Sequence, residues 1–213
     1  MNNLNNIELR RCNAAPELRV EVVNDEHGRA RRYLSGYAVL FEQYSRSFWD
    51  EWGEWVEIID RNAFANADMS DVVMVVDHSR EVGDILARSK DGVGTLEMSI
   101  DDNGIMFRFP IPDTTAGRDL YELIARGDVT ECSFAFWVRK DQWTYDMTID
   151  SKKMAERRII EVEKLADLSI VMRGQYSQTS VGIDERALAR SAREASTAQK
   201  TMSVATAKAI CNL

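Results

Sequence analysis

Two histidines set the limits on acid–base chemistry in this 213-residue chain. His27 lies in a polar, turn-like run, and we assign no chemistry to it. His78 follows the apolar run Val72–Val76 within Asp77-His78-Ser79, so we expect it at the mouth of a buried strand, held rigidly but open to solvent. That position suits proton transfer, although the local sequence alone favours a structural histidine.

Ser133 is the candidate nucleophile. It lies in the run Thr130–Val138, where alternation places Cys132 and the phenylalanines on one face and the hydroxyl of Ser133 on the other. The neighbouring Ala135 is small and leaves room for a substrate backbone. Serines are common on strands, so the local sequence by itself favours a structural role. Cys132 faces the opposite way and is predicted to be a buried core thiol rather than a nucleophile.

An acid for the same site is available near the end of the β-rich region. Asp167 and Ser169 alternate with Leu168 and Ile170. A carboxylate there can orient an imidazole and stabilise its protonated form, as the third member of a catalytic triad does. Spacing alone favours an ordinary carboxylate at a strand edge, and it does not establish that the three side chains meet.

Composition excludes several classes of protein. Against 27 basic residues stand 35 acidic ones, and this net charge of −8 argues against nucleic acid or an anionic membrane as the main partner. Three scattered cysteines fit neither a disulfide framework nor a zinc site and predict a reducing compartment. We expect no metal and no cofactor. The sequence has no apolar membrane span or secretory leader, so we predict a cytoplasmic protein.

Short strands dominate the pattern of polar and apolar residues. Strands are predicted at 18–22, 33–41, 54–59, 72–76, 83–88, 94–100, 105–111, 131–140, 157–165 and 168–172. The Asp101–Gly104 run predicts a hairpin turn between two of them. Many short strands with few helices indicate a closed or nearly closed β structure.

Two helices are predicted beside the strands. A short one spans 60–68, and a longer one begins at the N-cap candidates Asp113–Thr115 and ends at Arg126 before Gly127. Its Leu120, Leu123 and Ile124 share a face that we expect to dock on the sheet. The predicted organisation is a flexible arm over 1–16, one domain over 17–183, and an Ala/Ser/Thr-rich tail over 184–213, partly helical or disordered.

The chain resembles the prohead maturation proteases of tailed bacteriophages in an ordered series of short motifs between residues 33 and 182. The motifs are Gly36-Tyr37-Ala38 with Phe41, Ala63-Phe64, Asp77-His78-Ser79, Asp102-Asn103-Gly104, Ser133-Phe134-Ala135-Phe136 and Ala166-Asp167-Leu168-Ser169. Each motif is weak alone, but their order and spacing are specific. Three departures stand out: Arg61-Asn62 in place of Pro-Gly, Ala135 in place of a glycine, and Asp77 and Ser79 in place of Asn and Asp around the histidine.

The resemblance implies a serine endopeptidase on an antiparallel β-barrel of the herpesvirus-protease type with a few flanking helices. Carried over residue by residue, Ser133 is the nucleophile, His78 the general base, and Asp167 the orienting acid in place of a second histidine. The implied substrates are the major capsid protein with its scaffold segment and the protease itself. The implied location is the host cytoplasm, inside the assembling prohead, with a homo-oligomer as one arrangement.

Two other functions are weighed against the peptidase. The first is a non-catalytic assembly protein that binds capsid or scaffold protein on the same barrel. The second is an unrelated β-barrel binding module whose acidic domain binds a basic partner. The presence of all three candidate residues disfavours the non-catalytic assembly protein. Cleavage of a co-expressed capsid protein is expected only from the peptidase, so this observation distinguishes it from both alternatives. The tail after Asp184 is either a site of self-cleavage or a docking segment, and both roles can hold together.

Overall fold

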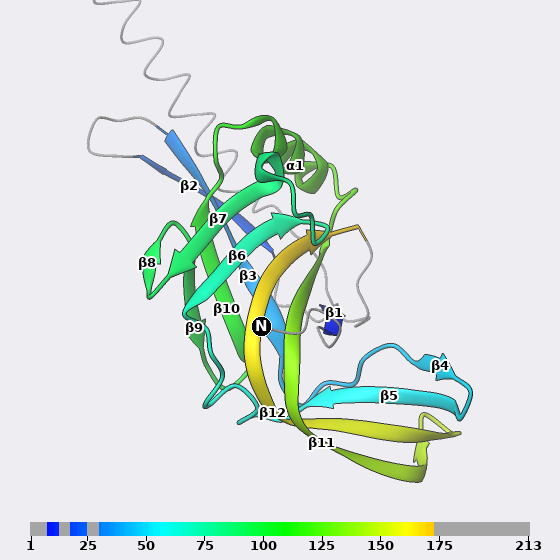
Figure 1. Cartoon of the computed structure of the whole chain (residues 1–213). Coiled ribbons are helices and arrows are strands. Elements are labelled where there is room, and N and C mark those ends of the chain that lie inside the picture. Colours follow the sequence, from blue (N-terminus) through cyan, green and yellow to red (C-terminus); the bar gives the residue numbers. More distant parts are fainter. Residues whose placement is uncertain (1–7, 13–17, 25–29, 173–213) are drawn as a thin grey trace, which may run out of the picture.

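The structure is a computed structural model that describes residues 8–12, 18–24 and 30–172. Figure 1 shows a mostly β molecule with one α-helix in this part of the chain. Its elements in chain order are β1 (Glu8–Cys12), β2 (Arg19–Asn24), β3 (Ala30–Leu40), β4 (Phe48–Asp50), β5 (Gly53–Ile59), β6 (Asp71–Val76), the 3-10 helix η2 (Val82–Asp84), β7 (Ile85–Lys90), β8 (Val93–Gly94), β9 (Glu97–Ile100), β10 (Gly104–Pro110), α1 (Thr115–Ala125), β11 (Glu131–Ile149) and β12 (Lys152–Val171).

The described strands form two separate sheets. The larger has eight strands, with the order β1-β11-β12-β6-β7-β8, while β5 pairs with β12 and β4 pairs with β5. The smaller has the order β2-β3-β10-β9. Strand β12 pairs in parallel with both β5 and β6, and the other strand pairs are antiparallel.

The mostly β fold is as predicted, but the closed antiparallel barrel is a wrong expectation. Within the described residues neither sheet closes on itself, and the larger one is mixed because of the two parallel pairs on β12. Alternation along the sequence reports which face of a strand is buried. It does not report which strands pair, or in which direction, and so could not separate two packed sheets from a barrel.

The core lies between the sheets and under α1. Its largest fully buried side chains include Phe107 and Phe109 of β10 and Phe134 and Phe136 of β11. The helix begins at Thr114, whose side chain accepts a hydrogen bond from the backbone N–H of Gly117, as an N-cap residue should. Helix α1 buries four residues, Gly117, Leu120, Tyr121 and Ile124, so the predicted helix and its docking are confirmed. Leu123 is an exception, because it is 38% exposed.

Other local predictions differ from the structure. Residues 61–66 form turns instead of the predicted helix over 60–68, with hydrogen bonds such as that from the Ala63 N–H to the Asp60 carbonyl. The two strands expected at 157–165 and 168–172 are one strand, β12. Its partner register skips Ala166, and this bulge shifts the alternation and makes one strand resemble two.

The terminal segments are only partly covered by the description. Residues 8–12 of the expected loose arm form strand β1, which is paired with β11. His27, the rest of the arm and the tail over 184–213 lie outside the described residues.

Candidate active site

Ser133 and Asp167 lie on neighbouring strands of the larger sheet. Strand β11 carries Ser133 opposite Ser169 of β12, and Ala135 lies opposite Asp167 in the same register. Because side chains of directly opposed residues point to the same face, these four share one face of the sheet. The alternating residues on the other face, such as Phe134 and Leu168, are fully buried in the core. The hydrophobic core therefore fixes where the polar face lies.

His78 reaches this face from a sharp turn at the end of β6. Asp77 and His78 both have positive φ, at 46° and 55°, a left-handed backbone that Asp and His tolerate better than most non-glycine residues. The Asp77 N–H donates to the carbonyl of Ile170 on β12, which holds the turn against the neighbouring strand. Strand β6 is itself paired in parallel with residues 167–170 of β12. The turn thus directs the imidazole back across β12 toward β11.

The structure brings the three predicted side chains into one chain of hydrogen bonds. The imidazole Nδ1 of His78 lies 2.6 Å from Oδ1 of Asp167, and its Nε2 lies 2.5 Å from Oγ of Ser133. An ionised carboxylate can only accept, so Nδ1 carries the proton and donates to Asp167. Nε2 is then the acceptor for the serine hydroxyl. This is the tautomer needed to take a proton from Ser133.

Ser169 is a fourth member that the sequence did not identify as functional. Its Oγ accepts a hydrogen bond from the backbone N–H of His78 at 2.8 Å and donates to Oδ1 of Asp167 at 3.4 Å. Ser169 is fully buried, so it fixes the histidine backbone and the carboxylate relative to each other. In the sequence, the feature that could have indicated a role for Ser169 is the alternation that places it on the same face as Asp167.

The site is closed in this conformation. Ser133 is 0% exposed, and the side chains of His78 and Asp167 are 9% and 21% exposed. A low-dielectric setting strengthens the His78–Asp167 interaction. It also means that a peptide carbonyl can reach Oγ of Ser133 only after some part of the chain moves.

Two searches of the described residues bear on other functions. No group of three or more His, Cys, Asp or Glu side chains there lies close enough to hold a metal ion. No helix within 8–12, 18–24 and 30–172 is both long and apolar enough to cross a membrane.

A serine hydroxyl bonded to a histidine that is bonded in turn to a carboxylate is the side-chain arrangement of serine hydrolases. Residues 18–194 match the Caudovirus prohead serine protease family, and the chain belongs to this family. The resemblance seen in the sequence motifs is therefore confirmed. The protein is a prohead serine protease, a peptidase that acts in capsid maturation.

The fold also has a counterpart among solved structures. It is similar to that of the bacteriophage T4 capsid assembly protease, gp21, with a TM-score of 0.50. The match covers 78% of this chain and 97% of that chain at 10% sequence identity. At this identity the likeness concerns the fold alone. No curated protein sequence matches the chain significantly.

Proposed function

We propose that Ser133 is the nucleophile of this protease, that His78 is its general base and acid, and that Asp167 orients and stabilises the imidazole. The observation that carries the proposal is the continuous hydrogen-bond chain from Ser133 Oγ through both ring nitrogens of His78 to Asp167. An aspartate as third member distinguishes the site from the two-histidine site of the herpesvirus capsid-assembly proteases, to which we infer a distant relationship.

The reaction follows from these positions. Oγ of Ser133 attacks the scissile carbonyl carbon while Nε2 of His78 takes the hydroxyl proton. The C–N bond then breaks, His78 gives that proton to the leaving amine, and an acyl-serine remains. Water attacks the ester with His78 again as base, which releases the carboxylic acid and restores the serine hydroxyl. Asp167 stays ionised throughout and stabilises the imidazolium that forms twice per cycle.

Family membership supports capsid and scaffold proteins as the substrates, because prohead proteases act during capsid maturation. We infer that this chain cleaves the scaffold segment of the major capsid protein, and also itself, inside the prohead in the host cytoplasm. The domain over 17–183 carries the chemistry in this proposal. The tail over 184–213 is offered as a self-cleavage or docking segment, and a homo-oligomer is the proposed assembly.

The test is the intact mass of both proteins after co-expression with the major capsid protein of the same virus. The comparison uses the unsubstituted chain, Ser133→Ala, and the control Ser89→Ala, which removes another buried serine hydroxyl from the same sheet. We expect shortened capsid protein with the unsubstituted chain and with Ser89→Ala, and full-length protein with Ser133→Ala. Cleavage that survives Ser133→Ala contradicts the nucleophile assignment. Co-purification without cleavage in every case supports the assembly-protein alternative.

A further inference from the structure

Strands β4 and β5, residues 139–149 of β11 and residues 152–159 of β12 project from the body of the molecule as a ribbon (Figure 1). This ribbon carries a cavity of about 710 Å³. The candidate catalytic side chains do not line the cavity. The stretch of β11 from Ser133 to Trp143 spans roughly 30 Å at the usual rise per residue of a strand. The same two long strands therefore carry the candidate active site at one end and a separate concave surface at the other.

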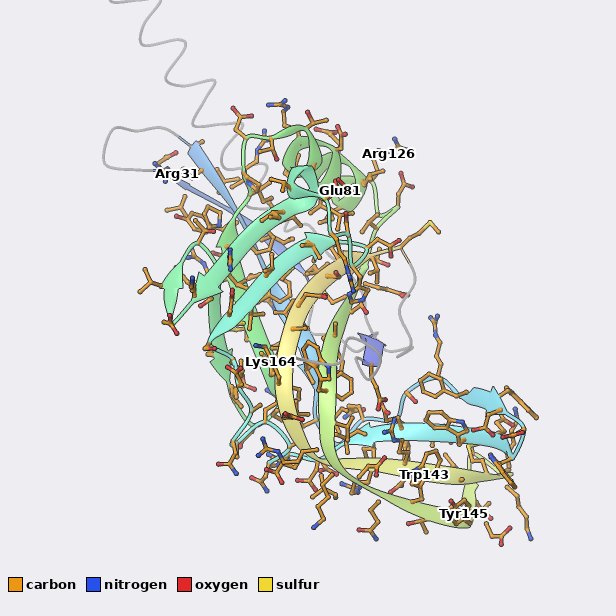
Figure 2. The ribbon with its side chains drawn as sticks, in the orientation of Figure 1. Arg31, Glu81, Arg126, Trp143, Tyr145 and Lys164 are labelled. Carbon is orange, nitrogen blue, oxygen red and sulfur yellow. The ribbon has the colours of Figure 1, made fainter. Side chains whose placement is uncertain are left out.

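Aromatic rings from two strands that are not neighbours line this cavity. Trp55 lies on β5, and Trp143 and Tyr145 lie on β11, while β12 runs between them with the small Ala155 opposite Trp55. Trp143 contacts both of the other rings, so their arrangement is set before any ligand binds (Figure 2). Tyr145 is 68% exposed. Exposed Trp and Tyr side chains gathered around a hollow are typical of a binding surface, because such rings contribute most of the energy at many interfaces.

A β-bulge brings Tyr145 and Asp146 to the cavity together. The register of β11 with β12 shifts between Thr144 and Met147, so that Tyr145 and Asp146 oppose the single residue Ala155. Asp146 has a φ of 57°, a left-handed conformation that aspartate tolerates. In a regular strand these two neighbours would point to opposite faces, whereas both line the cavity here. A bulge that redirects side chains in this way is a common feature beside functional sites.

The rim of the cavity is acidic. Asp50, Glu54 and Asp146 line it together with one base, Lys153, so three carboxylates face one ammonium group. Within the part of the chain that the structure describes, Glu54 and Asp146 form no ion pair. The faces of Trp and Tyr rings also carry negative electrostatic potential, which attracts an ammonium or guanidinium group. The charge and the rings both favour a cationic ligand.

The indole N–H of Trp55 adds a requirement for a hydrogen-bond acceptor. Its Nε1 is buried and has no hydrogen-bond partner among the described residues. A buried donor without an acceptor costs about 1–3 kcal/mol, so a ligand that supplies an acceptor is favoured. A simple cation cannot supply one. A peptide with a basic side chain supplies both groups, because its backbone carbonyls accept hydrogen bonds and its side chain carries the positive charge.

We propose that this cavity binds an extended segment of the capsid or scaffold substrate that carries a lysine or arginine. The basic side chain lies against the aromatic rings and pairs with Glu54 and Asp146, and a neighbouring carbonyl accepts from Trp55. A segment of about ten extended residues reaches from the cavity to Ser133. Binding on the ribbon raises the concentration of the scissile bond at Ser133. The proposal rests on the proposed function, because it takes capsid and scaffold proteins as the substrates.

The first experiment removes charge from the cavity while keeping its shape. The variant is Glu54→Gln with Asp146→Asn, and the matched control is Glu51→Gln with Asp150→Asn. Both control acids lie in turns of the same ribbon outside the cavity lining, and Asp150 has a positive φ as Asp146 does.

The measurement is KM and kcat for cleavage of purified capsid protein of the same virus at low ionic strength, where interactions between surface charges are least screened. We expect KM of the Glu54 and Asp146 variant to rise at least about threefold with kcat unchanged, and both constants of the control to stay within about 1.5-fold. An unchanged KM in the variant, or an equal rise in the control, overturns the proposal.

A peptide titration tests the chemistry of the ligand without any cleavage. The full chain with Ser133→Ala is titrated with a repeating Gly-Gly-Arg peptide, and with the same peptide in which uncharged citrulline replaces arginine. The indole N–H signals are followed by NMR, and that of Trp55 is assigned with Trp55→Phe. We expect the arginine peptide to shift the Trp55 signal with an affinity at least about fivefold higher than that of the citrulline peptide. Equal affinities, or a Trp55 signal that neither peptide shifts, overturn the proposal.

The tail of the chain is the competing occupant, because its sequence contains Arg186, Arg190 and Arg193. A full chain with all three changed to glutamine tests this alternative. A tail that holds the cavity competes with the substrate, so its neutralisation would lower KM and shift the Trp55 signal before any peptide is added. We expect neither change. A lower KM together with a shifted Trp55 signal rejects the substrate segment as the occupant.

Covalent labelling separates the failure of this proposal from failure of the proposed function. The parent chain and the Glu54 and Asp146 variant are treated with a fluorophosphonate, and the modified residue is mapped by mass spectrometry. Labelling of both at Ser133 with an unchanged KM rejects the ribbon as a substrate site and leaves the nucleophile assignment intact. A parent chain that is not labelled at Ser133 rejects the nucleophile, while the peptide titration still decides the ribbon site.

Discussion

The two halves of β11 and β12 differ sharply although they belong to the same pair of strands. In the half that carries Ser133 and Asp167, residues 132–136 are all buried, and one face packs into the aromatic core. In the other half, residues 139–149 are mostly exposed, and the two strands project from the body together with β4 and β5 (Figure 1). The half with Ser133 and Asp167 is stabilised by burial of its side chains in the core. The projecting half is stabilised by contacts between side chains on its surface.

Aromatic rings supply much of the contact in the projecting half. Trp55 of β5 meets Trp143 edge-on with ring centroids 5.1 Å apart, and Trp143 stacks with Tyr145 at 6.2 Å. Figure 2 shows Trp143 and Tyr145 on this ribbon, away from the body. A cavity of about 710 Å³ lies among these rings and the start of β12. The candidate catalytic side chains therefore lie on the buried half, where packing fixes their positions, and not on the projecting ribbon.

The largest expected effect is a loss of cleavage in the buried half. Asp167→Asn keeps the shape of the side chain but removes the charge that selects the Nδ1–H tautomer of His78 and stabilises its protonated form. We expect kcat to fall about 10⁴-fold. The measurement is the rate of capsid-protein cleavage, with Glu161→Gln as a control on the same strand. A fall of less than tenfold would show that Asp167 does not hold the catalytic imidazole.

A smaller effect is expected from Ser169→Ala. The substitution leaves the partly buried backbone N–H of His78 without its 2.8 Å acceptor. An unsatisfied buried donor costs about 1–3 kcal/mol of stability, and a partly buried one falls at the lower end, about 1 kcal/mol. We expect a loss of that size in the free energy of unfolding by urea, with a roughly tenfold lower kcat as His78 becomes less well positioned. A chain with unchanged kcat would mean that Ser169 serves the fold and not the reacting groups.

Substitutions in the projecting half should lower the stability of the protein without changing kcat for cleavage. Trp143→Ala removes ring contacts to Trp55 and Tyr145, and aromatic pairs contribute about 0.5–1.5 kcal/mol each beyond the area they bury. We expect a loss of about 1–2 kcal/mol in unfolding free energy and a kcat within twofold of the parent. Trp52→Ser, at a side chain 87% exposed, is the control and should leave both unchanged. A large fall in kcat for Trp143→Ala would contradict the claim that the projecting half contributes to stability but not to catalysis.

The smallest effect concerns the turn that leads into β6. Hydrogen bonds from Ser70 and Lys164 lower the pKa of Asp68 to about 2, with the Ser70 hydroxyl as the largest cause. A lowered pKa stabilises the folded state above the ordinary value of 3.8, and this contribution is lost as the pH falls through about 2. Carboxyl NMR titration should give that pKa in the parent chain and a value nearer 3.8 in Ser70→Ala. An Asp68 pKa near 3.8 in the parent chain would contradict the hydrogen bond from Ser70.

The same contrast explains how much the sequence could predict. The buried halves are predictable because large apolar residues alternate with small or polar ones along 131–136 and around Asp167, although both faces are buried there. The projecting ribbon lies beyond the predicted strand 131–140, although Trp143, Tyr145, Met147 and Ile149 alternate with polar residues in the manner of a strand. None of these four side chains is fully buried. The hairpin of the ribbon also turns at Asp150-Ser151, both with positive φ, whereas glycine or asparagine would have signalled such a turn.

The candidate site was predicted only in part. Residue types and motif order brought Ser133, His78 and Asp167 to attention, but no local pattern records that a turn after β6 crosses one strand to reach another. The pairing of β1 with β11 was also beyond reach, because residues 8–12 have too little alternation to suggest a strand. Long-range pairing is decided by packing of the whole chain, which short windows of sequence do not contain.

The most direct measurement of the Ser133–His78–Asp167 site is the rate of fluorophosphonate labelling in the purified chain, followed by intact mass and mapping of the modified residue. We expect one adduct, on Ser133, that forms at least about 10²-fold more slowly in His78→Ala, because the imidazole is the base that activates the hydroxyl. An adduct at another residue, or a rate at Ser133 unchanged by His78→Ala, would contradict the Ser133–His78–Asp167 site.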